Sequence, residues 1–153
     1  MTYGQIAKRV AQMRGLESMS SQAVGGAVGH NKEQRYRMRQ EEQTMSGMKN
    51  ISKAEVMVLK DQVEYQPGQV VSRTLAQNPA LSVTLFSFDK GEEISTHESG
   101  GDAFVTCLDG VGRITIDGKP YELHEGESIV MPAKHPHAVY GQEKFKMLLV
   151  VVF

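Results

Sequence analysis

Apolar and polar residues alternate in short runs from about residue 53 to the C-terminus, a pattern that predicts β-strands. The alternation is clearest at residues 81–85 and 114–116, where every second side chain is apolar. Turn signals separate the runs, among them Pro67-Gly68, Asp109-Gly110 and Asp117-Gly118. The expected strands cover residues 55–60, 70–75, 81–88, 103–108, 112–116, 121–124, 128–131, 138–140 and 145–153. Turn signals about eight to twelve residues apart are typical of a β-sandwich or barrel, and closure into a barrel removes exposed sheet edges.

The first 31 residues follow a helical pattern instead. Ile6, Val10 and Met13 share one helical face, and Thr2 stands where an N-cap belongs. A second short helix is expected within residues 20–28. Two short helices joined by a turn have the outline of a helix-turn-helix.

Charge divides the chain near the place where the hydrophobic pattern changes. Residues 1–50 carry eight Lys and Arg against four Asp and Glu, or +4, whereas residues 51–153 carry nine against fourteen, or −5. Residues 32–50 have little apolar periodicity, so a solvated linker or a frayed helix is expected there. We therefore expect a helix-turn-helix-like piece at 1–31, a linker at 32–52 and one all-β domain at 53–153.

Composition excludes several classes of protein. The overall net charge of −1 provides no general attraction to nucleic acid or to a membrane surface. The single cysteine, Cys107, excludes an intrachain disulfide and fits a reducing cytoplasm, where we expect the protein to be. Because Cys107 lies in a strand-like run, it is expected to be a buried, inert thiol. No apolar stretch approaches twenty residues, so no membrane span is expected.

Two histidines and a carboxylate at the ends of expected strands form the candidate site. Asp102 follows His97 after a Gly100-Gly101 turn, and His137 is entered through Pro136. Two neutral imidazoles and a carboxylate suit divalent Fe, Mn, Ni or Zn, with open positions for water or substrate. His97, Asp102 and His137 are therefore the expected metal ligands.

Other interpretations of these residues stay open. Without a metal, a histidine beside Asp102 would be a general acid–base pair near neutral pH, and histidines in a lumen can also be satisfied polar groups without chemistry. Ser99 shares a face with His97 in an extended strand, where it holds a metal-bound water or keeps the cavity open. His135 either points inward as a further ligand or lies on the rim.

The same two segments resemble the paired motifs of the cupin superfamily. The positions that match are Gly91, His97 and Gly110 in the first motif and Gly126, Pro132 and His137 in the second, and Asp102 takes the place of the family's glutamate. Ser99 stands where the family has a second histidine, and Lys134 replaces an internal glycine. The resemblance implies a small antiparallel, jelly-roll-like β-barrel with His97, Asp102 and His137 at ligand positions and one usual ligand missing. It also implies a homodimer.

Residues 3–7 and 23–31 closely resemble the DNA-binding part of methylated-DNA–protein-cysteine methyltransferases, a DNA-repair family. Tyr3 matches the tyrosine that helps to rotate the damaged nucleotide in that family, whereas Gln22 stands where an arginine is expected. The family's nucleophilic cysteine segment does not follow, so alkyl transfer is excluded. Contact of Lys8 and Arg9 with DNA would be weak and nonspecific, and the alternative is a fusion remnant without activity.

Three functions compete on this basis. The leading hypothesis is a cupin with a lumen site for a divalent metal and a small polar molecule, with dioxygenase or isomerase chemistry if the protein is an enzyme. The second is a non-catalytic barrel that binds a sugar or a small acid. The third is a DNA-associated protein anchored by its N-terminal piece.

Overall fold

The computed structural model describes residues 31–44 and 47–153. The expected helix-turn-helix and the residues matched to the methyltransferase family, Tyr3, Lys8, Arg9 and Gln22, lie outside the described residues. The chain divides after Arg37 into two units, and each is described here by itself. Within the described residues, no helix is long and apolar enough to cross a membrane.

Helix α2 (Lys32–Thr44) occupies most of the segment that was expected to be a linker or a frayed helix. Asn31 and Gln34 cap its start reciprocally. The Gln34 N–H donates to Asn31 Oδ1 at 2.8 Å, and the Asn31 N–H donates to Gln34 Oε1 at 3.1 Å. These bonds satisfy two backbone donors that helix formation leaves unpaired, which explains why a helix begins here.

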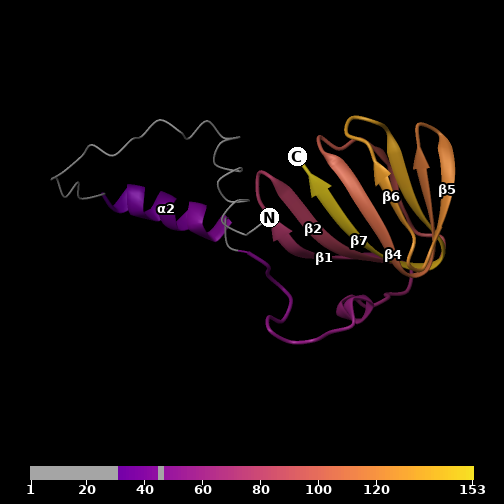
Figure 1. The fold of residues 1–153 in the computed structure, drawn as a ribbon, viewed down its shortest axis with the longest axis horizontal. Helices are drawn as coiled ribbons and strands as arrows, with labels where there is room; N and C mark the ends of the chain where they lie inside the picture. The colour runs from indigo at the N-terminus through magenta and orange to yellow at the C-terminus, as the bar shows by residue number, and fades with distance from the viewer. Residues whose placement is uncertain (1–30, 45–46) are drawn as a thin grey trace, which may run out of the picture. The chain divides into compact units, whose positions relative to one another are not determined.

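Seven antiparallel strands form the barrel within the described residues. They are β1 (Val70–Gln77), β2 (Leu81–Phe88), β3 (Glu93–His97), β4 (Asp102–Ile116), β5 (Lys119–His124), β6 (Ser128–Met131) and β7 (His137–Val152). The hydrogen-bonded order is β1-β2-β7-β4-β5 (Figure 1). Strand β3 is added on β7, and β6 is added on β4. The all-β antiparallel barrel expected from the sequence is thus confirmed.

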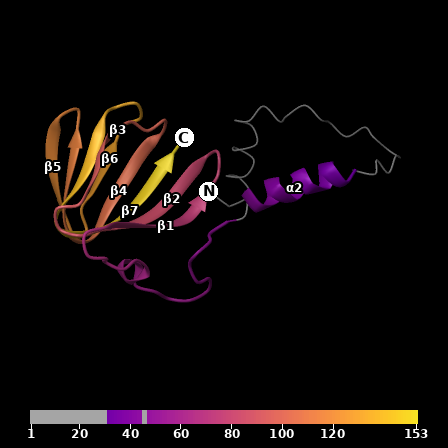
Figure 2. The same cartoon turned by 180° about the vertical axis from the view of Figure 1, so that it is seen from behind.

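The two longest strands belong to both walls of the barrel. The C-terminal part of β7 pairs with β2, and its beginning pairs with β3; the first part of β4 pairs with β6, and its end pairs with β5 (Figure 2). Register shifts between Cys107 and Asp109 and between Gly110 and Gly112 mark the place where β4 changes direction. Because β4 and β7 bend together, one pair of strands closes a barrel that would otherwise be an open sheet.

The structure corrects three sequence expectations about the strands. The expected turn at Asp109-Gly110 is a bulge inside one continuous strand, so residues 103–108 and 112–116 both belong to β4. Residues 138–140 and 145–153 likewise join in β7. Residues 55–60 form no strand; a 3-10 helix, η1 (Leu59–Gln62), follows Val58. In addition, strand β3 was not among the expected strand ranges, although His97 was expected at a strand end.

The interior consists of two apolar clusters on opposite faces of the same strands. The larger cluster fills the lumen, and its fully buried members include Phe88, Val105, Ile114 and Phe145. The smaller cluster lies outside the sheet, where Val63 packs with strand residues and with residues before β1. Three apolar residues of the segment before β1, Ile51, Leu59 and Val63, therefore pack on the outer face of the sheet. Val56 and Val58 are 100% and 56% exposed, and residues 55–60 pair with no strand.

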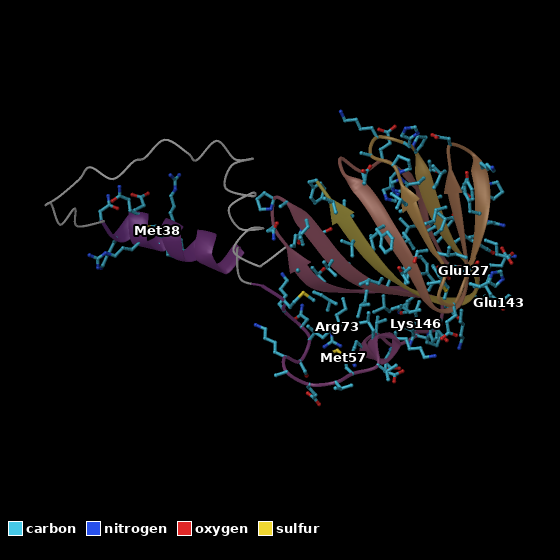
Figure 3. All side chains as sticks on the ribbon, viewed as in Figure 1. Met38, Met57, Arg73, Glu127, Glu143 and Lys146 are labelled. Atoms are coloured by element: carbon cyan, nitrogen blue, oxygen red, sulfur yellow. The ribbon has the colours of Figure 1, made fainter. Side chains whose placement is uncertain are left out.

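Two cationic side chains hold this segment in place by hydrogen bonds to its backbone carbonyls. Lys146 Nζ donates to the Lys60 carbonyl at 2.7 Å, and Arg73 Nη1 donates to the Gln62 carbonyl at 2.5 Å. Figure 3 shows the labelled Arg73 and Lys146 beside the segment that precedes β1. These charge-assisted bonds satisfy backbone acceptors of η1, so the outer cluster is closed without an additional strand.

Candidate functional site

Strand pairing brings the two expected histidines together. His97 is the last residue of β3 and His137 the first of β7, and the two are direct partners in the antiparallel register. Their ring centroids are 4.5 Å apart, with an interplanar angle of 72°. Residues forty positions apart in sequence therefore meet edge to face, because β3 pairs with the beginning of β7 and not with β2, its neighbour in the chain.

Each ring is oriented by a backbone carbonyl two residues earlier. His97 Nδ1 lies 2.8 Å from the Ser95 oxygen, and His137 Nδ1 lies 3.0 Å from the His135 oxygen. A carbonyl only accepts, so each Nδ1 carries the proton and donates it. In the neutral ring, Nε2 then holds a lone pair, and neither Nε2 has a hydrogen-bond partner among the described residues. This is the tautomer in which imidazoles bind metals or accept from a ligand.

The two histidines line a cavity of about 240 Å³ inside the barrel. Eight of its lining residues are apolar and belong to several strands, and four are polar and lie at the β3–β7 end. The lining consists of Phe86, Ile94, His97, Glu98, Ser99, Ala103, Met131, His137, Val139, Met147, Leu149 and Val151. The cavity is therefore an apolar chamber with one polar end.

Burial keeps His137 in its neutral form. Only 2% of the residue is exposed, and this burial lowers the pKa of its imidazole, as does the charge of a protonated His97. The hydrogen bond to the His135 carbonyl and the Glu98 carboxylate oppose the shift, but the net direction is downward. His137 is thus unprotonated at neutral pH and available as a ligand.

The structure does not bring Asp102 to the histidines. Its side chain is exposed, next to the buried Ala103 that lines the cavity, so strand alternation directs it to the outer face. There Asp102 Oδ1 accepts the Ala133 N–H at 2.8 Å and holds the loop before His137. Within the described residues, no three His, Cys, Asp or Glu side chains are grouped as a metal site.

The accessory residues separate into two groups. Ser99 lines the cavity, and its Oγ accepts the Gly101 N–H at 3.2 Å. His135 does not line it and lies on the rim, where its Nδ1 is 2.6 Å from Asp117 Oδ2. Cys107 is 1% exposed, and burial raises the pKa of its thiol to about 11, as expected for an inert cysteine.

Sequence reasoning missed Glu98, whose carboxylate belongs to the polar end of the cavity. Alternation with His97 would direct Glu98 outward, but β3 ends at His97 and the chain then turns. Glu98 and His97 are exposed and His137 is buried, and all three line the same end of the cavity. Two adjacent imidazoles suit a divalent transition ion, whose remaining ligands would have to come from Glu98, the bound molecule or water.

Comparison with known proteins supports the same fold. Residues 84–153 match the family model described as a cupin domain. A conserved protein of unknown function from Streptococcus pyogenes is 52% identical, with a TM-score of 0.69 over 71% of this chain and 95% of that one. A cupin superfamily protein from Desulfitobacterium hafniense is 32% identical, with a TM-score of 0.68 over 71% and 99%.

A cupin 2 conserved barrel domain protein from Leptotrichia buccalis is 50% identical, with a TM-score of 0.62; the match covers 62% of this chain and 46% of that one. No curated protein matches the chain. The family model and the similar structures agree on the barrel fold. The chain therefore belongs to the cupin superfamily.

Proposed function

We propose that the barrel binds a small molecule in its lumen together with a divalent transition metal held by His97 and His137. The observation that carries this proposal is the shared orientation of the two imidazoles. Each Nδ1 donates to a fixed backbone carbonyl, each Nε2 is unpartnered among the described residues, and both rings line one cavity. Such outer hydrogen bonds orient ligating histidines in metalloproteins.

The remaining polar residues have distinct roles in this proposal. Glu98 supplies a carboxylate oxygen, either as a third ligand or as the acceptor of a proton from the bound molecule. Ser99 lines the same end and keeps it open because its side chain is small. The apolar walls exclude water from the bound molecule and strengthen polar interactions at the mouth. A bound ion would supply Lewis acidity, the chemistry that dioxygenase- or isomerase-type cupin reactions need.

The test is a Co²⁺ titration of the full chain after treatment with chelator. Calorimetry and visible absorption together give the stoichiometry and show whether nitrogen ligands are bound. We expect one equivalent per chain, with binding lost in the His97→Ala, His137→Ala double variant. The matched control is His124→Ala, because His124 lies between Glu122 and Glu127, at 2.9 Å from each, and does not line the cavity. Binding that survives the double variant, or is lost with His124, contradicts the proposal.

A second candidate function is a metal-free binding barrel without catalysis. It is favoured by the position of Asp102, since only two imidazoles are held together and the expected third ligand binds the Ala133 backbone instead. The Co²⁺ titration separates the two candidates. A protein that takes up no ion but still binds small molecules in its lumen supports the second.

A further inference from the structure

The polarity of the cavity is confined to one end. Its polar residues are consecutive at the end of β3, His97, Glu98 and Ser99, and are joined by His137 from the start of β7. All other lining side chains are hydrocarbon or thioether, including Met131 and Met147. A molecule with hydroxyl groups along its whole length would lose hydrogen bonds to water along these walls without replacement. The walls therefore disfavour a sugar.

The polar end contains hydrogen-bond acceptors and, among the described residues, no lysine or arginine. The Glu98 carboxylate there is negative. Both imidazole Nδ1–H groups donate to backbone carbonyls, so what each ring offers the cavity is the lone pair of Nε2. The nearby Arg113 guanidinium is occupied outside the barrel, 4.4 Å from the centre of the Tyr140 ring. A small carboxylate would thus meet acceptors and another negative charge.

The size of the chamber limits the body of the ligand. An apolar protein cavity of about 150 Å³ can hold one benzene molecule. The chamber here, about 240 Å³, is larger by roughly half and holds one ring or a branched chain of similar size. The volume beyond one benzene site is smaller than a second such site, so two separate rings would not fit side by side.

We propose that the lumen binds a compact, mainly apolar, uncharged molecule that carries one hydroxyl donor, such as a phenol or an enol, with that donor on the imidazole Nε2 atoms. This inference rests on the proposed lumen site and replaces the sugar or small acid suggested by the sequence with a defined ligand class. It does not require the metal, because the same hydroxyl donates to a free Nε2 or approaches an ion held there. One polar end selects the head group, and the apolar walls select the body.

The experiment observes ligands from inside the chamber. The full chain is labelled at its methionine methyl groups; of its nine methionines, Met131 and Met147 line the cavity and are 2% and 1% exposed. Met48, 42% exposed and outside the cavity, serves as an internal control. Chelator-treated protein is titrated at pH 7 with phenol, toluene, benzoate and glucose, and methyl shifts give each affinity.

We expect phenol to shift the Met131 and Met147 methyl signals and to leave Met48 unchanged. Toluene, which has the same body without the donor, should bind roughly 3- to 10-fold more weakly, the worth of one hydrogen bond. Benzoate should bind at least about 10-fold more weakly than phenol, because its charge is uncompensated. Glucose should produce no shift. Glu98→Gln should narrow the gap between benzoate and phenol, whereas Glu55→Gln, the same charge change at an exposed site outside the cavity, should not.

The inference is overturned if benzoate or glucose binds as tightly as phenol, if toluene equals phenol, or if no probe shifts the two buried methionines. Its failure is distinguishable from failure of the metal proposal. Phenol binding without Co²⁺ uptake would contradict the metal proposal and support the proposed ligand class. Co²⁺ uptake without phenol binding, in either metal-free or metal-loaded protein, would support the metal proposal and contradict the proposed ligand class.

Discussion

The bend of β4 and β7 depends on one glycine, and the effect of its substitution on the stability of the barrel can be calculated. Gly112 lies where β4 crosses from one wall of the barrel to the other, directly above the Phe145 ring. A Cβ at Gly112 would lie 2.5 Å from Phe145 Cζ and 2.6 Å from Cε1 and Cε2. Carbon atoms pack at about 3.5–4.0 Å, so Gly112→Ala requires the ring to move by roughly 1 Å.

Phe145 has no room for that movement. It is fully buried, and its ring centroid lies 5.5 Å from that of Phe88, also fully buried. Forcing one methyl group into a packed core costs about 1–3 kcal/mol. For a barrel of about 100 residues, about 2 kcal/mol corresponds to a fall in Tm of roughly 8–16 °C. Gly112→Ala should therefore lower the Tm by this amount.

The chain has no tryptophan, so urea and thermal unfolding are followed by circular dichroism. Gly100→Ala is the matched control, since no neighbouring atom lies within 4 Å of its Cβ, and it should change stability by less than about 1 kcal/mol. Phe145→Leu combined with Gly112→Ala should be more stable than the sum of the single effects by about 1 kcal/mol or more. Equal stability of the two alanine variants, or strict additivity with Phe145→Leu, would refute the steric reasoning.

Three further predictions test other parts of the molecule. Lys134 has a φ of +63°, a backbone conformation that glycine adopts without strain. Lys134→Gly should therefore raise the free energy of unfolding, measured by urea titration, by about 0.5–1 kcal/mol. A lower free energy of unfolding would show that the lysine side chain stabilises the loop. The Cys107 thiol, with a pKa of about 11, should react with a thiol reagent at pH 8 only at the rate of unfolding, and immediate reaction would contradict its burial. Three apolar side chains are exposed on one face of the sheet: Phe104 on β4 (43%), Val130 on β6 (50%) and Val152 on β7 (57%). If the expected homodimer uses this face, sedimentation should show a dimer that the Phe104→Asp substitution converts to a monomer. A dimer that survives this substitution would place the interface elsewhere.

Strand positions could be predicted because half-buried strands impose alternation on the sequence. Residues 81–88 and 128–131 were located to the residue as β2 and β6. Residues 55–60 contain a continuous apolar run, residues 56–59, yet they form no strand, and Leu59 packs against the outer face of the sheet. An apolar segment in the sequence indicates that its side chains are buried. It does not indicate whether the segment pairs with a neighbouring strand or packs against the face of a sheet.

The bends and β3 could not be predicted from local pattern. Asp109-Gly110 has turn composition, but Gly110, with a φ of +73°, is used for a bulge within β4. Such a bulge and a hairpin turn require the same residue type. Their difference lies in the pairing of β4 with β7, which is a long-range contact.

Strand pairing determines that the two histidines lie together, whereas the alternation of side chains along β4 determines the position of Asp102. His97 and His137 meet as predicted, because motif spacing places both at strand ends that pair. Asp102 was assigned a turn back toward the lumen, but it begins β4 and alternates outward from Ala103. Glu98 lies just after the last residue of β3, and the sequence alone does not show that it lines the cavity. A one-residue difference in strand boundary decides which carboxylate faces the cavity.

The most direct test of the account is the tautomer and metal response of the two lumen histidines, observed by side-chain ¹H–¹⁵N NMR of the full chain. At neutral pH we predict Nδ1–H and a free Nε2 for both His97 and His137, as their carbonyl partners require. One equivalent of Zn²⁺ should then shift both Nε2 resonances together and leave His124 unchanged. An Nε2–H tautomer in either ring, or a response of only one of them, would contradict a site shared by His97 and His137.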